Sequence, residues 1–315
     1  MGEIVKEVSS DRRAAAPESL FGPAWLQRIV SGGALPVTDR RSAGLDRGAI
    51  RLFPPNINHI PSFEISFCNR ANPCPIHAVK PRRLDQILAN YGYCSRSEAK
   101  RWIRGRRVVV AGQPAEAPED KADPTTVLID GQPVEFPEGI LALFHKPAGC
   151  VCTHEHREGP TVFDLLPPRW ARRNPPVTSV GRLDKDTTGL LIVTDIGELV
   201  QRWTSPRHKV PKIYEVTVDG AIDPKLIELF ASGRLLLDDE DKPCLPARLE
   251  IISPHEARLE LVEGKFHQVK RMFSSQSLNV VKLHRSRVGE FDLTGIESGK
   301  WKMLAVGDLL VNRIR

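Results

Sequence analysis

Apolar and polar positions follow a regular period only from about residue 80 onward. Leu84, Ile87, Leu88 and Tyr91 have the i, i+3, i+4, i+7 spacing of an amphipathic helix, and Gly92 interrupts the pattern. These side chains fall on one face, which a folded domain must cover. The spacing therefore predicts a short helix at the start of the first domain.

A second helix is predicted to follow at once. The run Ser95-Arg-Ser-Glu98 has the spacing of a capping box, in which both side chains accept hydrogen bonds from backbone amides at the helix start. This helix would bury Ala99 and Ile103 and end near Gly105. Val108-Val-Val110 then predicts a small β-segment. A linker rich in Pro, Glu and Asp is expected over 114–124 and a strand over 125–128.

Strands and short helices alternate from Ile140 onward. Strands are predicted at 140–144, 177–180, 190–194, 214–218, 247–252 and 257–261, and short helices at 161–166, 197–203 and 223–232. The last three strands are close enough in sequence to form antiparallel sheet. Helices mixed with such a sheet predict an α+β fold.

The first 79 residues lack such a period. They hold eight prolines and six glycines, so we predict a disordered extension over 1–79. The next methionine after Met1 is Met272, and a later start would need a non-AUG codon such as that of Val79. Our hypothesis is that this extension is absent from the native protein or dispensable, which an intact-mass measurement tests.

Composition narrows the class of protein. The chain has 315 residues, 41% of them hydrophobic, which is enough for two domains with a sizeable core. No run of eighteen apolar residues and no secretory signal is present in the sequence, so no membrane association is expected. Six cysteines without a regular framework favour reduced thiols and a cytoplasmic protein. We expect a monomer.

Positive charge is concentrated in one segment. The formal net charge is +6, and the segment 80–107 holds nine Lys or Arg residues against two Asp or Glu residues. Such a patch suits a phosphate backbone, because neutralising phosphates releases condensed counterions. From charge alone, a solvated basic face is an equally good interpretation.

Asp184 is the strongest candidate for chemistry. It lies in the run Gly-Arg-Leu-Asp-Lys-Asp-Thr-Thr-Gly-Leu-Leu-Ile at 181–192, between two predicted core strands. A carboxylate among glycine and apolar positions suits a catalyst better than a solvated loop. The alternative is a turn in which Asp184 and Thr187 cap local backbone donors.

This run resembles the signature of the pseudouridine synthases related to RluA and RsuA. Two further segments, 212–216 and 263–273, are similar to the second and third motifs of that family. The segments 205–208 and 280–289 resemble the RsuA type of bacterial ribosomal RNA enzyme more narrowly. The resemblance extends from about Pro81 to Leu310, with all three motifs in the expected order.

The first domain resembles the S4 RNA-binding module. Arg83-Leu84-Asp85, Ser95-Arg96 and Gly105 match its usual string. The resemblance implies a small S4-like α/β domain over 80–135, followed by a mixed, largely antiparallel catalytic domain over 139–315. It also favours RNA as the partner of the basic patch. The residues expected to bind RNA there are Arg83, Arg96, Lys100, Arg101 and Arg104.

The family implies a role for each matched site residue. Asp184 would be the essential carboxylate, and Tyr214 would stack on the target base, although it could instead be a packed strand aromatic. Lys270 and Arg271 are rival cationic partners for Asp184; the alignment favours Lys270 and leaves Arg271 for phosphate or structure. Arg182 is expected to enter the space that an extruded uridine vacates.

Three other residues have weaker assignments. His267 and Gln268 are expected to support the RNA surface or the fold. Leu191 is expected either to cover the site or to be an ordinary core leucine. The Cys150-Val-Cys-Thr-His-Glu-His156 run has ligand-like residues, but four ligands crowded into one loop argue against a metal.

The implied function is isomerisation of a specific uridine to pseudouridine in ribosomal RNA, most closely in 16S RNA of the small subunit. This reaction needs no metal or cofactor. The expected partner is ribosomal RNA or a small-subunit precursor particle. The alternatives are a 23S RNA enzyme and a non-catalytic RNA-binding assembly factor; Asp184, Tyr214 and Lys270 together argue against the latter.

Overall fold

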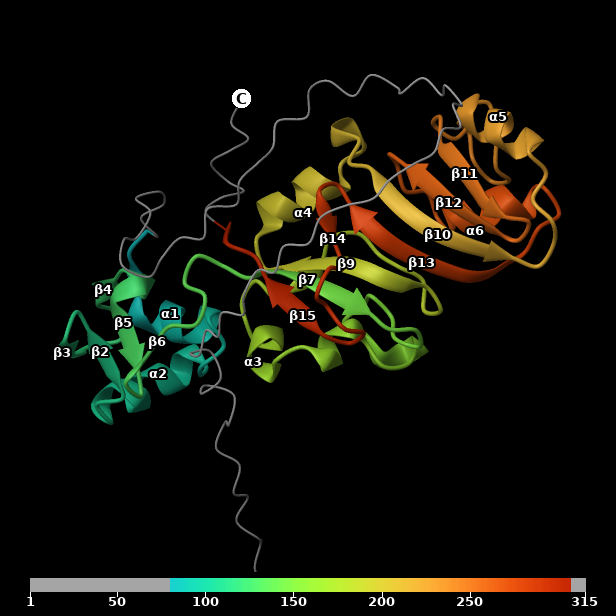
Figure 1. The fold of residues 1–315 in the computed structure, drawn as a ribbon. Coiled ribbons are helices and arrows are strands. Elements are labelled where there is room, and N and C mark those ends of the chain that lie inside the picture. The colour runs from blue at the N-terminus through green and yellow to red at the C-terminus, as the bar shows by residue number, and fades with distance from the viewer. Residues whose placement is uncertain (1–79, 307–315) are drawn as a thin grey trace, which may run out of the picture. The chain divides into compact units, whose positions relative to one another are not determined.

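The computed structural model describes residues 80–306 (Figure 1). The predictions for the 1–79 extension therefore lie outside the described residues. Within the described range, no helix has both the length and the apolar character that crossing a bilayer demands.

The first domain packs two helices beside small sheets. Helix α1 (Leu84–Asn90) and helix α2 (Arg96–Arg104) contact one another, and the capping box at Ser95 and Glu98 is formed. Ala99 and Ile103 are buried as predicted, together with Leu84, Ile87 and Leu88. The strands are β1 (Arg82–Arg83), β2 (Val108–Val110), β3 (Gln113–Pro114), β4 (Lys121–Ala122), β5 (Val127–Ile129) and β6 (Gln132–Pro133).

Two predictions for this domain are wrong in detail. The segment 114–124 is not only a linker, because β4 lies in it and pairs with β1. The strand expected over 125–128 begins later, because Pro124–Thr126 forms a short 3-10 turn (η1). The carboxylate of Asp123 caps that turn by accepting a hydrogen bond from the Thr125 amide, and the strand β5 starts after it.

The larger domain is built on one mixed sheet. Within residues 80–306 this sheet has nine strands, in the order β11-β12-β10-β13-β9-β7-β15, with β14 beside β13 and β8 beside β9 (Figure 1). The strands are β7 (Leu141–Lys146), β8 (Thr178–Ser179), β9 (Thr188–Thr194), β10 (Lys212–Val218), β11 (Arg248–Ser253), β12 (Glu256–Leu261), β13 (Val280–Val288), β14 (Phe291–Asp292) and β15 (Trp301–Met303). Only the β9–β13 pair among them is parallel, so the predicted α+β fold with a largely antiparallel sheet is confirmed.

Short helices accompany this sheet. They are α3 (Pro168–Ala171), α4 (Gly197–Thr204), α5 (Lys225–Ala231) and α6 (Gln268–Ser274), with 3-10 turns η2 (His156–Glu158), η3 (Val162–Leu165) and η4 (Pro206–His208). Helix α5 packs against β11 and α6 against β13. The helix expected over 161–166 is therefore a single 3-10 turn, which Thr161 and Asp164 cap reciprocally.

The centre of the sheet is buried on both faces. Along β9, Leu191 and Val193 enter one apolar core, whereas Leu190 and Ile192 enter the core on the opposite face. Successive side chains of a strand point to opposite faces, so a strand covered on both sides is apolar at every position. This arrangement explains the unbroken Leu-Leu-Ile-Val run and makes β9 a rigid support for the loop before it.

Gly189 allows the close contact between β9 and β13. Its φ is +118°, and a Cβ atom there would overlap the backbone of Arg285 on the paired strand. A side chain at this position would therefore push the two strands apart. The glycine of the Asp184 run thus serves the sheet that carries the site.

Candidate active site

Asp184 lies in the loop between β8 and β9. Hydrogen bonds to the segment after β7 hold this loop in place. The Gly149 amide donates to the Lys185 carbonyl at 2.8 Å, and the Leu183 amide donates to Cys152 Sγ at 3.5 Å. The Thr187 amide closes a turn onto the Asp184 carbonyl at 3.1 Å. The backbone on both sides of the carboxylate is therefore fixed.

Lys146 reinforces this support from inside the domain. Its side chain is completely buried, and Nζ donates to the carbonyls of Pro147, Lys185 and Thr187 at 3.1, 3.2 and 2.8 Å. Burial lowers the pKa of the lysine, because removal from water disfavours its charged form. Three carbonyl acceptors compensate the buried ammonium.

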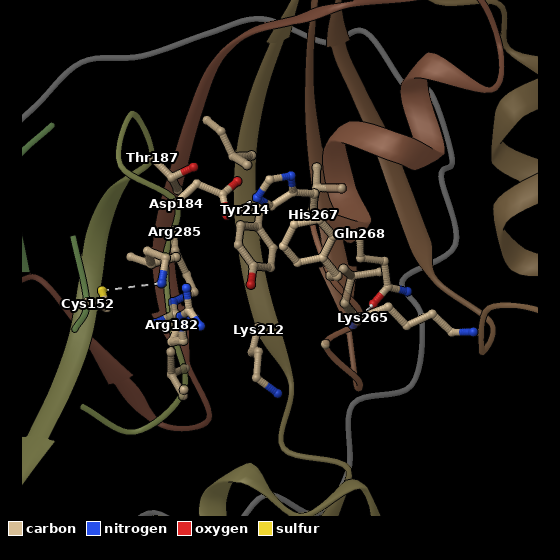
Figure 2. A pocket seen from close by; sticks show the side chains of 18 of the residues that line it. Cys152, Arg182, Asp184, Thr187, Lys212, Tyr214, Lys265, His267, Gln268 and Arg285 are labelled. Atoms are coloured by element: carbon tan, nitrogen blue, oxygen red, sulfur yellow. Dashed lines mark hydrogen bonds and ion pairs between the residues drawn. The ribbon is translucent and has the colours of Figure 1, made fainter. Parts of the chain in front are cut away.

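Two basic side chains from the third motif meet Asp184. Lys270 Nζ lies 3.1 Å from Asp184 Oδ2, and His267 Nε2 lies 3.3 Å from Asp184 Oδ1. Figure 2 shows the carboxylate and the imidazole directed toward one another, with Tyr214 beside them. The Asp184 side chain is 25% exposed, so it remains accessible to a ligand while its orientation is fixed.

Lys270 is shared between two carboxylates. Its Nζ also contacts Asp186 Oδ1 and Oδ2 at 2.7 and 2.9 Å. Burial lowers the pKa of Lys270, but the hydrogen bonds to Asp186 and Asp184 outweigh it and raise the pKa above its ordinary value. The hydrogen bond from Lys270 in turn lowers the pKa of Asp186.

The carboxylate faces a cavity of about 630 Å³. The Tyr214 side chain, on β10, lines this cavity and is only 9% exposed. Apolar side chains complete the wall; they include Val151, Leu183, Leu261, Val269 and Leu283. A cavity of this size with a few convergent polar groups suits a ligand as large as a nucleoside.

Cationic side chains surround the apolar wall. Arg182 is exposed at the cavity, and Lys212 and Arg285 also line it. Lys212 Nζ donates to the Val210 carbonyl at 3.1 Å, and burial, with a smaller effect from Arg285, lowers its pKa. Arg285 is buried and donates to the Leu190 carbonyl at 2.8 Å. This set of cations suits an anionic ligand such as a phosphodiester.

Arg271, the other expected partner of Asp184, contacts different groups. Its Nη1 lies 3.2 Å from Glu240 Oε1 and 3.2 Å from the Phe266 carbonyl. Glu240 also accepts a hydrogen bond from Lys265 Nζ at 3.0 Å, so the Glu240 carboxylate braces the third motif. The structure thus brings Lys270 to Asp184 and assigns Arg271 to the turn before α6.

His267 lies where the sequence did not place it, whereas Gln268 supports the fold, which is one of its two expected roles. His267 was expected at the RNA surface or in the fold, but its imidazole contacts Asp184. Gln268 is buried and donates to Glu263 Oε1 at 2.6 Å, which fastens the turn. Leu191 is fully buried in the core, which agrees with the second of its two expected roles.

Thr187 has an unusual hydroxyl. Its Oγ1 is buried and has no hydrogen-bond partner among the described residues, and the residue lines the cavity (Figure 2). A buried hydroxyl without a partner is costly, and a ligand could reach this one only after local movement, because Oγ1 has almost no exposed surface.

The basic residues of the first domain divide into two groups. Arg83 and Arg96 both pair with the buried Asp85, at 3.1 and 2.9 Å, so part of their charge serves the fold. Lys100, Arg101 and Arg104 lie exposed on α2, and Arg101 also pairs with Glu98 at 3.3 Å. The second group is the better phosphate-binding surface.

In the loop over 150–156, the side chains that could bind a metal make separate local contacts. His154 stacks on Phe163, His156 lies 3.6 Å from Asp164, and Cys150 and Cys152 are buried thiols. No group of three or more His, Cys, Asp or Glu residues within 80–306 is arranged to hold a metal ion.

Several cavity residues were absent from the predicted site. Lys212 and Arg285 lie in the segments 212–216 and 280–289, which resemble family motifs. Their positions at the cavity depend on how the strands β10 and β13 pair, which the sequence does not show. The register pairs Tyr214 on β10 with Arg285 on β13, which brings the two strands' side chains together. Thr187 also lies in the Asp184 run, and its sequence position indicates only a capping role.

Comparison with known proteins identifies the family of both domains. The RNA pseudouridylate synthase family model matches residues 140–275, and the S4 domain model matches residues 82–128. Ribosomal small subunit pseudouridine synthase A of Vibrio parahaemolyticus is 39% identical over 229 residues, covering 70% of this chain and 95% of that protein. The Escherichia coli K12 protein of the same name is 40% identical over 215 residues, covering 67% and 90%.

A solved structure gives the same result. The crystal structure of a pseudouridylate synthase matches with a TM-score of 0.51 and 32% sequence identity, covering 73% of this chain and 98% of that chain. The S4 model and the synthase model match successive parts of the chain, in the order of its two domains. The chain therefore belongs to the RNA pseudouridylate synthases, in the group that carries an N-terminal S4 domain.

Proposed function

We propose that this enzyme converts one uridine of small-subunit ribosomal RNA to pseudouridine, with Asp184 as its catalytic carboxylate. The names of the relatives that match most of their own length support the small subunit as the target. The proposal includes the division into an S4 domain over 80–135 and a catalytic domain over 139–315. It also includes a monomeric enzyme that acts in the cytoplasm on ribosomal RNA or a precursor particle.

The observation that carries the proposal is the arrangement around Asp184. One carboxylate reaches the cavity while Lys270 and His267 fix its two oxygens, and Tyr214 lines the same cavity. A site that only bound RNA would have no need of a carboxylate, which repels phosphate. The orientation of Asp184 therefore supports catalysis over passive binding.

The reaction exchanges one bond to the sugar for another. The bond between C1′ and N1 breaks, the base turns, and a bond from C1′ to C5 forms, while C5 loses a proton and N1 gains one. No electron is gained or lost overall, so a positioned carboxylate and a proton acceptor suffice. Asp184 would act on the nucleoside, and Tyr214 would stack on its base and assist removal of the C5 proton.

RNA would be held at two places. The exposed charges of Lys100, Arg101 and Arg104 on α2 would contact phosphates. Arg83 and Arg96 would contribute less positive charge to RNA binding, because both pair with Asp85. At the cavity, a uridine must leave its stack to reach Asp184, and the exposed Arg182 would occupy the space left behind. In this assignment His267 serves the carboxylate, and Arg271 serves the turn that carries Lys270.

Mapping pseudouridines in ribosomal RNA from a strain lacking this gene tests the target. Loss of one site in 16S RNA, restored by the intact gene but not by Asp184→Asn, is the expected result. Loss of a site in 23S RNA instead would assign the enzyme to the large subunit. An unchanged pseudouridine map, with altered subunit assembly, would support the RNA-binding assembly factor and contradict the proposal.

A further inference from the structure

Phe266 is a large aromatic side chain left exposed at the rim of the cavity. It is 72% exposed, more than any other large hydrophobic residue in the described part of the chain, and it lines the same cavity as Asp184. Leaving such a side chain in water forgoes the free energy gained by burying its apolar surface. Its position at the site therefore calls for an explanation other than packing.

The ring is backed on one side. Phe266 stacks on the His267 imidazole with 3.8 Å between ring centroids and 19° between planes. Its carbonyl accepts a hydrogen bond from Arg271, which Glu240 holds in turn. The phenyl ring is consequently a supported surface with one covered face, and the large exposed fraction of the side chain places its other face in solvent.

The backbone is shaped to present this pair of rings. His267 has a φ of +47°, a left-handed conformation that is unfavourable for a residue with a Cβ atom. The conformation places His267 at the N-terminus of α6, between the Phe266 ring and the Asp184 carboxylate. Such strain at a site is retained where the surrounding contacts determine it.

The surroundings of Phe266 favour RNA over a protein partner. Phe266 lines a cavity that carries cationic residues, Arg182, Lys185 and Lys265, and also acidic ones such as Glu158 and Glu263. A charged lining of this kind differs from the contiguous apolar patch typical of protein interfaces. A flat base can stack on the exposed ring while cations of the lining contact its phosphates. Base stacking on an aromatic side chain contributes about 1–3 kcal/mol per base.

We infer that Phe266 is a stacking platform for the base next to the extruded uridine. The inference rests on the proposed function, because it needs a uridine in the cavity. The target base would lie deeper, against Tyr214, which is 9% exposed, whereas Phe266 lies at the rim. Extrusion deprives the neighbouring base of one stacking partner, and the open face of Phe266 replaces it.

The test measures binding with turnover blocked. Full-length Asp184→Asn protein, with and without Phe266→Ala, is titrated with a small-subunit RNA fragment containing the mapped uridine. Otherwise identical RNA fragments carry an abasic site in place of the target uridine or of one of the two nucleotides next to it. Phe266→Trp tests retention of stacking, and Val281→Ala, which truncates an exposed hydrophobic residue on β13 outside the cavity lining, is the control.

Phe266→Ala is expected to weaken binding of the intact fragment about 5- to 100-fold, and Phe266→Trp and Val281→Ala to leave it nearly unchanged. An abasic site at one neighbour should weaken binding to the same extent and remove the effect of Phe266→Ala. Undiminished binding by Phe266→Ala, or an effect that persists on every abasic fragment, would overturn the inference. An effect removed only by an abasic target would assign Phe266 to the extruded base and overturn it as well.

Conversion of the same intact fragment by the unsubstituted enzyme reports the proposed function separately. Tight binding without conversion would contradict that function, while the comparison of Phe266→Ala across the fragments would still decide the stacking role.

Discussion

Lys146 donates a 2.8 Å hydrogen bond to the carbonyl of Thr187 from a position with no exposure to solvent. The same ammonium reaches the Lys185 carbonyl, so it holds the backbone on the C-terminal side of Asp184. A buried charge is costly unless its hydrogen bonds are made, and here three carbonyls accept them. The position of the Asp184 carboxylate therefore depends on Lys146, although Lys146 does not line the cavity.

Replacing Lys146 by methionine should destabilise the domain and slow the reaction. The substitution leaves buried carbonyls unsatisfied, and we expect the free energy of unfolding to fall by about 2–4 kcal/mol. Urea denaturation measures this, and single-turnover kinetics measure the rate. Lys185→Met, which removes an exposed side chain, should cost less than about 1 kcal/mol. Equal stabilities for the two variants would contradict the role of Lys146.

Thr187→Val separates stability from function. Its hydroxyl has no partner among the described residues, so a methyl group of the same shape should leave stability unchanged or raise it by about 1 kcal/mol. If the hydroxyl binds the nucleoside, the single-turnover rate should fall about tenfold. Thr188→Val is the matched control, because its hydroxyl bonds to His284 at 2.8 Å and its loss should destabilise. Full activity in Thr187→Val would show that the hydroxyl takes no part.

The pairing of Lys270 with Asp186 sets a pH window. The pKa of Lys270 is raised above 10.5, so its contribution to stability is complete below that pH and is lost as pH rises through the folded-state value. The pKa of Asp186 is lowered below 3.8, so its contribution is complete above that pH and is lost as pH falls through the folded-state value. The pair is therefore intact across the neutral range.

Asp186→Asn should lower the pKa of Lys270 by removing one of its two carboxylates. At neutral pH the ammonium remains charged and activity should persist, but the alkaline decline in single-turnover rate should begin at lower pH. Rate profiles of both proteins between pH 6 and about 10.5 measure the shift. Superimposable alkaline limbs would show that Asp186 does not control the lysine.

Charge removal on α2 should weaken RNA binding in a salt-dependent way. Lys100, Arg101 and Arg104 are exposed together, and replacing all three by alanine should lower the slope of log affinity against log salt by about one for each phosphate that is no longer neutralised. Affinity titrations at several salt concentrations test this. An unchanged slope would place the RNA grip elsewhere. Lys225→Ala on α5 is a control for charge removal outside the cavity and the S4 domain.

Local features were predictable from the sequence. The capping box at Ser95, the buried face of α2 and the double-sided burial of β9 each depend on residues within one element. Their spacing alone carries the information, because caps and periodic burial act over a few residues. The Asp184 run could also be recognised, since its residues lie together in the chain.

Contacts between residues far apart in the sequence could not be predicted from the hydrophobic pattern or from the motifs. Asp186 and Lys270 are 84 residues apart, and nothing in either run shows that one ammonium serves two carboxylates. His267 reaches Asp184 because of a left-handed backbone at the start of α6, which the residue type does not announce. Arg96 was predicted only as an RNA ligand because its pairing with Asp85 forms only when α1 and α2 pack, whereas the Arg83–Asp85 pair is local and spans two residues.

The most direct test of the account replaces the carboxylate itself. Purified Asp184→Asn and Asp186→Asn proteins are compared with the unsubstituted enzyme for tritium release from 5-³H-uridine in small-subunit ribosomal RNA. The account predicts no detectable release with Asp184→Asn and substantial release with Asp186→Asn at neutral pH, with RNA affinity retained by both. Release by Asp184→Asn at the rate of the unsubstituted enzyme would contradict it.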